Sequence, residues 1–525
     1  MVNLTPRQQK SLKDSLNSWD IEGAKGLKVV VIGAGLAGLA TTCHLLGTGH
    51  EVTVVERGLE SGGRASCIKD AGFVMDNGPT VFTMISLVDA ALRAVGSSLR
   101  ERLDLVELLP AYRAFYSDGR SFDGEGSIDV HASKDAMYEE IKRKCSSKDA
   151  ESYIKFSRYL KRLYEVEFPN YIDKNIDGIS SLLSSPKAAI SLLKLRAFSS
   201  LDSVVSSYFN DERLIKLFSF QALYAGLSPL EARAIYAIIT YMDSVEGVYY
   251  PRGGMNQIPK ALEDAASDAG ATFEFEFSVK GLEYRDGRKK ARRVVAVIGD
   301  DGNRIEADAV VVTTELAQAY DTFLDDLRCP KVVATGEYSP SAYLHLMGVR
   351  GTPKGFAHHN IFFGASWREA FRALLHDGQK MPEPSLLVSL PTVSDLSIAP
   401  PGHSVLYALE PVPNLGAAID WSLERVRTRS QMVQRVSQFG FINDETDILV
   451  EQIYDPKDWL SMGMSKGTPF ALSHRFFQSG PFRPANFSKE VENLFFAGST
   501  TTPGVGVPMV LTSGKLAAQR IAGIV

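Results

Sequence analysis

Three glycines and one glutamate form the most chemically specific pattern in the chain. Gly33, Gly35 and Gly38 have the spacing Gly-x-Gly-x-x-Gly, and Glu56 follows the next apolar run. In this spacing the first glycine permits a tight turn, the second lets a pyrophosphate approach bare backbone, and the third lets a helix pack closely on a strand. A carboxylate at Glu56 can accept hydrogen bonds from both hydroxyls of a ribose. The pattern predicts a nucleotide site, and the alternative is a glycine turn with a structural role alone.

The residues around these glycines predict the elements that a nucleotide site needs. Residues 29–32 are valine and isoleucine, which predicts a short, buried parallel strand. A helical pattern follows over residues 39–46, and residues 51–55 predict a second strand that ends at Glu56. Strand, glycine turn, helix and strand within residues 28–56 are typical of a dinucleotide-binding βαβ unit. The free N–H groups at the start of the helix would face the phosphates.

A second glycine pair, Gly62 and Gly63, has Arg57 before it and Arg64 directly after it. Nicotinamide enzymes do not need such a segment. The segment resembles one in flavoproteins of the amine-oxidase and carotenoid-desaturase group, where a similar Gly-Gly-Arg crosses back over the pyrophosphate. There the glycines allow close approach and the arginine supplies positive charge. By that resemblance the cofactor is FAD.

The last distinctive segment predicts a second corner of the same site. Residues 493–496 indicate a buried strand, and Gly498 and a rigid loop lead to a helix over residues 511–521. The free amides at the start of that helix could bind flavin phosphate or ring oxygens. The alternative is that this strand, loop and helix have a packing role alone. The presence of the N-terminal nucleotide motif in the same chain favours contact with the cofactor.

The composition is that of a soluble globular protein. Of 525 residues, 45% are hydrophobic and 23% are charged, and the net charge of −5 argues against a general nucleic-acid binder. The four cysteines are scattered without a Cys-x-x-Cys pair. They predict neither a zinc site nor a disulfide framework and fit a reducing compartment. The nine histidines are dispersed as well, so no metal site is expected.

Two stretches bear on the question of a membrane. The uncharged residues 29–43 superficially resemble a signal peptide, but they begin too far along the chain and their glycines have a nucleotide-binding rationale. No other apolar stretch has the roughly 20 residues of a spanning helix, so none is expected. Residues 178–201 contain Lys187, Lys194 and Arg196 but no acid, which suits the surface of an anionic bilayer. The alternative is an amphipathic helix packed on its own core.

The residues between the nucleotide motifs divide into two kinds of pattern. Residues 85–248 are mostly helical in pattern, whereas residues 330–475 alternate between strand and helix patterns. A strand is predicted over residues 271–279. Residues 294–299 and 305–312 flank a turn and predict a hairpin that continues the same sheet.

Several motifs along the chain together resemble the bacterial-type phytoene desaturases, which are FAD-dependent carotenoid desaturases. The resemblance covers nearly the whole chain from Lys28 and lies in residues 31–38, 76–80, 250–254, 408–413, 478–484 and 493–509. In the last motif, members of that family usually have histidine and glycine where this chain has Thr502 and Met509. The Pro508-Met509 pair also resembles the branch that desaturates later intermediates at the 3,4 position.

The resemblance implies an α/β fold: a doubly wound, Rossmann-like FAD-binding domain made of discontinuous pieces, and an α+β substrate domain with a helical, membrane-facing part. The expected boundaries are residues 28–85, 250–320 and 480–525 for the FAD-binding domain, 86–249 for the helical substrate and membrane region, 321–479 for the rest of the substrate domain, and 1–27 for an N-terminal arm. The cofactor-binding residues that it implies are Gly33, Gly35, Leu36, Ala37, Gly38, Glu56, Arg57, Gly63, Arg64, Pro79, Val279, Gly498, Val507, Pro508 and Met509.

The activity that the resemblance implies is desaturation of a carotenoid, with phytoene as the expected substrate. A carbon of the substrate gives a hydride to the flavin and its neighbour loses a proton. No catalytic residue, and in particular no base, can be assigned from the sequence. A 3,4-desaturase acting on a hydroxylated or neurosporene-type intermediate is the alternative; a flavin amine or porphyrinogen oxidase and a non-enzymatic prenyl-binding carrier are also kept.

The implied partners are a long apolar polyene, membrane lipid in peripheral contact, and oxygen or a quinone as electron acceptor. Neither a nucleic acid nor a metal is expected. The expected location is the cytoplasm, with peripheral attachment to the inner face of the cell membrane.

Overall fold

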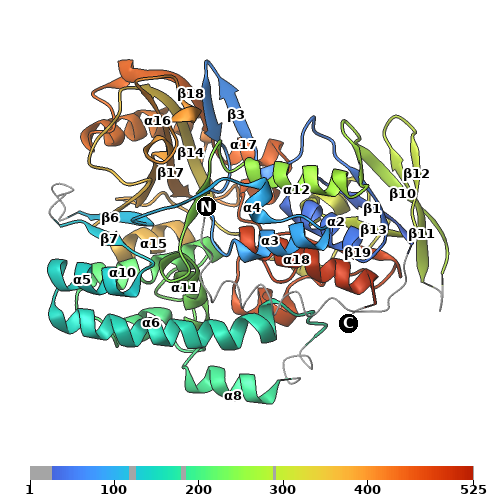
Figure 1. Cartoon of the computed structure of the whole chain (residues 1–525), viewed down its shortest axis with the longest axis horizontal. Helices are drawn as coiled ribbons and strands as arrows, with labels where there is room; N and C mark the ends of the chain where they lie inside the picture. Colours follow the sequence, from blue (N-terminus) through green and yellow to red (C-terminus); the bar gives the residue numbers. More distant parts are fainter. Residues whose placement is uncertain (1–25, 118–125, 179–184, 288–290, 524–525) are drawn as a thin grey trace.

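The computed structural model describes residues 26–117, 126–178, 185–287 and 291–523. The arm expected over residues 1–27 therefore lies almost wholly outside the described residues. Figure 1 shows a layer around a parallel sheet, a second sheet beside it, and a helical layer below the second sheet.

The first sheet is parallel and five-stranded in the described residues. Its strand order is β19-β13-β1-β2-β9, and every pairing in it is parallel. The bounds are Lys28–Ile32 for β1, Glu51–Val55 for β2, Thr272–Glu274 for β9, Ala309–Val312 for β13 and Leu494–Phe496 for β19. Because all strands run the same way, the residues after them meet at one edge of the sheet.

The central strand β1 is buried on both faces, as its unbroken apolar run predicts. Val29 and Val31 pack with side chains of α2 (Leu36–Gly47) and α18 (Val507–Ile521). Val30 and Ile32 point the other way, into a cluster with α13 (Leu316–Thr322). Helices therefore cover both faces, and the predicted doubly wound α/β class is confirmed.

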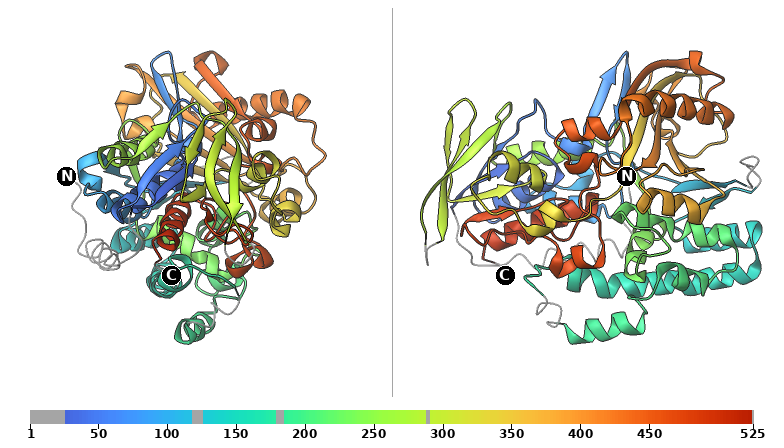
Figure 2. Two further views of the ribbon diagram at one scale, coloured as in Figure 1. Left: turned by 90° about the vertical axis from the view of Figure 1, so that its right-hand side faces the viewer. Right: turned by 180° about the vertical axis from the view of Figure 1, so that it is seen from behind.

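One expectation about this region is wrong. The predicted hairpin exists as β11 (Arg292–Gly299) and β12 (Arg304–Glu306), but it joins β10 (Val279–Asp286) in a separate, three-stranded antiparallel sheet. The physical reason is a change of direction after β12: the Asp308 N–H donates to the Lys28 carbonyl at 2.7 Å, and β13 then pairs in parallel with β1. The small sheet lies at the end of the molecule, away from the second sheet (Figures 1 and 2).

The second sheet is mixed and has the order β18-β14-β17-β16-β15-β6-β7 in the described residues. Its long antiparallel centre is β14 (Ser341–Arg350) with β17 (His403–Val412). The other bounds are Tyr112–Tyr116 for β6, Ile128–Val130 for β7, His359–Phe363 for β15, Leu386–Ser389 for β16 and Ile448–Tyr454 for β18. Helix α16 (Trp421–Gln438) buries Trp421, Met432 and Val436 in a cluster with side chains of this sheet.

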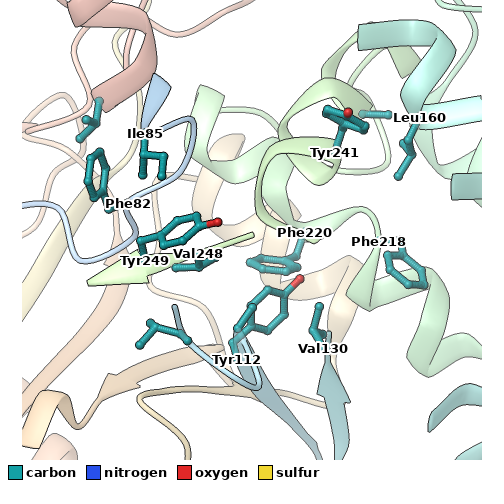
Figure 3. Packing of buried hydrophobic residues seen from close by; sticks show 14 of the residues in the cluster. Phe82, Ile85, Tyr112, Val130, Leu160, Phe218, Phe220, Tyr241, Val248 and Tyr249 are labelled. Atoms are coloured by element: carbon teal, nitrogen blue, oxygen red, sulfur yellow. The ribbon is translucent and has the colours of Figure 1, made fainter. Parts of the chain in front are cut away.

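A helical layer lies against both sheets. Its main helices are α5 (Lys134–Lys144), α6 (Ser147–Glu167), α8 (Pro186–Lys194), α9 (Leu201–Ser206), α10 (Glu212–Leu217) and α11 (Ala237–Ser244). Figure 1 shows α8 as the outermost of them, below α6. Rings such as Tyr112, Phe218 and Phe220 fill the space between this layer and β6 and β7 (Figure 3).

The remaining elements are short connections. They include β3 (Cys67–Asp70), β4 (Phe73–Asp76), α3 (Ser86–Ala94), α4 (Leu99–Arg102), β5 (Leu105–Glu107), β8 (Tyr249–Pro251), α12 (Gln257–Asp268), α14 (Lys331–Thr335), α15 (Trp367–Leu375) and α17 (Pro456–Ser461). Among the described helices, none combines the length and the apolar character needed to cross a membrane.

The contact of α18 with α2 depends on one glycine. A Cβ added at Gly514 would lie 2.5 Å from the Ala37 carbonyl oxygen and 3.0 Å from the Thr41 amide nitrogen. Both atoms belong to the backbone, so neither can move aside without shifting a helix. The two helices can approach this closely only because residue 514 has no side chain.

We therefore expect Gly514→Val to lower the free energy of unfolding by about 1–3 kcal/mol through overpacking. The measurement is the denaturation midpoint at matched FAD saturation. Gly281→Val is the control, because no atom lies within 4 Å of a Cβ at that position, and its midpoint should not fall. Equal midpoints for the two variants would contradict the close-packing role of Gly514.

Candidate functional site

The glycine turn after β1 has the geometry that its spacing predicts. Gly33 has φ +109°, and a Cβ there would lie 2.7 Å from Thr313 Oγ1. A Cβ at Gly38 would overlap the Gly33 carbonyl oxygen, so Gly38 serves the packing of the helix on the turn. Gly35 begins α2 with open space around its missing side chain. A phosphate could approach the backbone at Gly35, where the first amides of α2 lack acceptors within the helix.

Glu56 lies at the carboxyl end of β2 and points toward this turn. Its Oε2 accepts from the Ala34 N–H at 2.8 Å, and its Oε1 accepts from the Gly58 N–H at 2.8 Å. An ionised carboxylate has about four acceptor positions, so two of these bonds leave room for ribose hydroxyls. The position suits the predicted role of Glu56.

The segment from Gly62 to Arg64 lies directly against the first glycine turn. The Gly62 N–H donates to the Ala34 carbonyl at 2.9 Å, and a Cβ on Gly63 would lie 3.3 Å from Gly35 Cα. Two backbones approach this closely because both positions are glycine.

Arg64 forms a connection that the sequence did not reveal. Its Nη2 lies 2.8 Å from Glu315 Oε2, and its Nη1 donates to Ser499 Oγ at 2.7 Å. Glu315 is buried, follows β13, and also accepts from Thr500 Oγ1 at 2.5 Å. Arg57, in contrast, is exposed and donates to the Met462 carbonyl at 2.7 Å. The available signal for Glu315 was an acid three residues after a buried strand.

The C-terminal loop forms the second corner and is fixed by Arg483. This arginine is 3% exposed and donates to the carbonyl oxygens of Leu472, Gln478, Ser499 and Thr501. Burial lowers the pKa of Arg483 to about 10. The Phe-Arg-Pro sequence around it carried the resemblance, but its role as a clamp on the loop depends on contacts that a sequence does not show.

Helix α18 then begins at the cavity with Val507, Pro508 and Met509. Gly506 precedes it with φ +111°, and no side chain among the described residues caps its first amides. Met509 packs against Met84, Ile238 and Met242. The N-terminus of α18 therefore faces the same space as the N-terminus of α2.

One large cavity, of about 1560 Å³, connects these features with the helical layer. Among the predicted site residues, Gly38 does not line it; the fourteen others do. They are Gly33, Gly35, Leu36, Ala37, Glu56, Arg57, Gly63, Arg64, Pro79, Val279, Gly498, Val507, Pro508 and Met509. The cavity continues past Phe220, Ile361 and Leu409 of the interior to Ala189 and Leu192 of α8. A polar nucleotide corner and a long apolar chamber thus form one space.

The residues of this corner fit an FAD molecule. Two uncapped helix starts supply amides for phosphate, open backbone at Gly35 permits close approach, and Glu56 supplies a ribose acceptor. The described residues contain no group of three or more histidine, cysteine or acidic side chains that could hold a metal ion.

The chain is similar to flavoenzymes over nearly its whole length. The family model described as flavin containing amine oxidoreductase matches residues 36–522. A phytoene dehydrogenase of Streptomyces griseus is 43% identical over 498 residues, which cover 94% of this chain and 95% of that relative. A zeta-carotene-forming phytoene desaturase of Myxococcus xanthus is 32% identical over 508 residues, covering 95% and 94%.

Solved structures share the fold. An oxidoreductase from Methanosarcina mazei has a TM-score of 0.60 at 19% identity and covers 93% of this chain and 99% of its own. A triple mutant of putrescine oxidase has a TM-score of 0.58 at 15% identity and covers 95% and 99%. These neighbours confirm the predicted α/β fold.

We expect Glu56→Ala to weaken FAD binding by about 10- to 150-fold, because a hydrogen bond to a charged group is lost. Equilibrium dialysis against free FAD measures the change. Glu56→Gln keeps the size of the side chain and should lie between Ala and wild type. Glu60→Ala, at an exposed acid nearby, should bind FAD as wild type does. Wild-type affinity in Glu56→Ala would remove Glu56 from the site.

Proposed function

The chain belongs to the flavin-containing amine oxidoreductases and, within them, to the phytoene desaturases, and from this membership we infer that it is an FAD-dependent carotenoid desaturase. The single structural observation that carries this inference is the continuous cavity. It joins a dinucleotide corner to an apolar chamber that extends to α8. A long hydrocarbon needs an apolar chamber of this kind beside the group that oxidises it.

FAD, when bound, supplies a two-electron acceptor for a hydride, which no amino-acid side chain offers. The protein positions the substrate and excludes water from it. Apolar side chains such as Ile361, Leu387 and Leu409 line the chamber and can hold the polyene in one orientation. They also keep water away from the positive charge that develops when a hydride leaves carbon.

We propose phytoene as the substrate. Support comes from the relatives named phytoene dehydrogenase and zeta-carotene-forming phytoene desaturase. Met509 and Thr502, which line the cavity, support a second candidate activity. This is 3,4-desaturation of a hydroxylated or neurosporene-type carotenoid. A methionine fills space that a glycine leaves open, and its flexible thioether adapts to an irregular wall, so Met509 bears on how deeply a substrate inserts.

Anaerobic bleaching of the flavin tests this function. We expect the FAD absorbance of the purified holoenzyme to fall when phytoene is supplied in liposomes, because the hydride passes to the flavin. Putrescine is the matched control and should leave the spectrum unchanged. Bleaching by a neurosporene-type carotenoid but not by phytoene would replace the first substrate with the second. Bleaching by the amine alone would point to an amine oxidase.

We propose that α8 is the membrane-facing entrance of the chamber. Ala189 and Leu192 line the cavity, whereas Ile190 and Leu193 on the same helix are 52% and 65% exposed. A helix that faces a hydrocarbon chamber on one side and solvent with apolar side chains on the other suits the surface of a bilayer. Phe476 and Phe477 also line the cavity and are exposed.

A basic pocket supports the same proposal. It has a volume of about 330 Å³ and lies between α6 and the segment after α8. The cations around it are Lys155, Arg158, Arg162, Lys194 and Arg196, and its lining contains no carboxylate among the described residues. Phosphate groups of anionic lipids are attracted to such a cluster. Residues 179–184, part of the stretch predicted to bind the membrane, lie outside the described residues.

This arrangement would put the enzyme at the inner face of the cell membrane, on the cytoplasmic side. It would then be within reach of a membrane quinone, which we propose, with oxygen, as the terminal electron acceptor.

We expect the triple variant Lys187→Glu, Lys194→Glu and Arg196→Glu to detach from anionic liposomes, since each basic residue near the surface contributes about 1 kcal/mol. Co-sedimentation with vesicles measures binding. The control triple variant Lys69→Glu, Lys280→Glu and Lys331→Glu makes the same charge change at exposed sites away from α8 and should still sediment. Detachment of both triple variants alike would show a general charge effect.

A further inference from the structure

A desaturase needs a group that takes a proton, and the cavity contains candidates that the proposed function leaves unused. Five carboxyl groups line it in the described part of the chain: Glu56, Glu167, Glu231, Asp243 and Glu315. Glu56 accepts backbone amides at the nucleotide corner, and Glu315 is paired with Arg64. Glu231 contacts His376 at an exposed position. Glu167 and Asp243 remain.

Asp243 is buried in the inner part of the cavity, near the end of α11. Its side chain is 3% exposed, and its Oδ1 has no hydrogen-bond partner. Leaving a buried carboxyl oxygen unsatisfied costs about 1–3 kcal/mol or more, so such a group calls for a functional explanation. Burial also raises the pKa of Asp243 well above its ordinary value, which makes its ionised form a stronger base.

The surroundings of Asp243 are polar, although the cavity is mostly apolar. The Gln221 amide lies within electrostatic reach of the Asp243 carboxylate and favours its ionised form. The Gln221 Nε2 also donates to Tyr112 Oη at 3.2 Å, and Thr240 Oγ1 donates to Gln221 Oε1 at 3.2 Å. Tyr112 lies beside Phe220, a cavity residue, as Figure 3 shows. These bonds, with a further one from Gln221 Nε2 to the Leu217 carbonyl at 3.1 Å, fix the orientation of the Gln221 amide beside the carboxylate.

Two sets of contacts connect Asp243 with the cofactor corner. Met242, which precedes it, packs in one cluster with Met509 of the first turn of α18. Tyr224 lies within electrostatic reach of both Asp243 and Tyr407. Tyr407 in turn donates to the Gly78 carbonyl at 2.9 Å, in the segment packed against Arg64.

We propose that Asp243 accepts the proton that the substrate loses during desaturation. One carbon gives up a hydride, which FAD takes up when bound. The neighbouring C–H bond then breaks: its electron pair becomes the π bond of the new double bond, and its proton bonds to a carboxylate oxygen of Asp243. When the product leaves, the proton passes to water.

Glu167 shares the burial of Asp243 and lines the same cavity. It ends α6, is 7% exposed, and also has an unpartnered oxygen, Oε2. Its electrostatic neighbour Tyr159 lines the basic pocket near α8. Its neighbour Phe168 packs in the cluster of Met242 and Met509, but no described side chain acts on the Glu167 carboxylate as Gln221 acts on that of Asp243. Glu167 is therefore the buried acid with which Asp243 is compared.

The test compares Asp243→Asn with Glu167→Gln in full-length holoenzyme, and it rests on the proposed function. Both variants should retain FAD. Anaerobic flavin reduction by phytoene in liposomes should slow by about 10²–10⁴-fold in Asp243→Asn, the range of general base catalysis, and stay near the wild-type rate in Glu167→Gln. Asp243→Glu keeps the carboxylate and should restore part of the rate, which separates loss of the base from loss of folding.

The pH profile supplies a second readout. The wild-type reduction rate should rise with pH as Asp243 ionises and then level, whereas the profile of Asp243→Asn should be flat. Tyr112 of β6 and the interior Tyr224 have electrostatic contact with Asp243; burial raises the pKa of both well above the ordinary value, so they stay neutral across the measurable range.

Three outcomes would overturn the proposal. Wild-type reduction rates in Asp243→Asn would exclude Asp243, and equal slowing in both variants would indicate a shared effect on substrate passage. If Asp243→Asn instead raised the KM for a hydroxylated carotenoid and left the flavin reduction rate unchanged, Asp243 would be a binding group for a polar end of the substrate. If no carotene bleaches the wild type, the proposed function itself fails, and this result is distinct from the other three.

Discussion

The ion pair between Arg64 and Glu315 connects the parts of the site. Arg64 follows the second glycine pair, Glu315 follows β13, and Ser499 and Thr500, which complete the cluster, precede α18. The Glu315 side chain is 4% exposed, so removing its partner would leave a nearly buried charge, a loss that typically costs about 3–5 kcal/mol. Three distant segments of the chain are held at one point, and the cofactor corner has its shape because they meet there.

The cofactor corner is polar, whereas the rest of the cavity must be apolar. A polyene offers no hydrogen-bonding groups, so its chamber must be apolar, yet the backbone around it must be satisfied within the protein. The long strands β14 and β17 meet this need because their backbone groups bond to each other while side chains such as Tyr407 and Leu409 face the chamber. Polar groups in this space are few, and for that reason each one calls for a chemical explanation.

Local patterns could be predicted from the sequence, whereas long-range pairings could not. The turn from Gly33 to Gly38 and the position of Glu56 follow from spacing within one βαβ unit, and the structure has both. The sequence predicts a single strand over residues 305–312, because they are continuously apolar apart from two acids. The chain instead changes direction at Asp308, through a bond to Lys28 that no local pattern reveals. Arg483 and Asp243 were missed for the same reason: their roles depend on carbonyls, rings and helices that are distant in sequence.

Because the FAD site is built from segments far apart in sequence, the order in which the chain is synthesised determines when the site can form. A ribosome releases β1 and α2 early, but α18, which packs on α2 and supplies amides to the phosphate corner, emerges only after all the strands of both sheets. Domains generally fold as they leave the ribosome, from the N-terminus onward. Until α18 has been made, apolar surface of the first βαβ unit stays uncovered and the flavin site lacks its second corner. Because a ligand that binds the native state alone stabilises it, vitamin supply becomes a determinant of how much of the newly made protein survives.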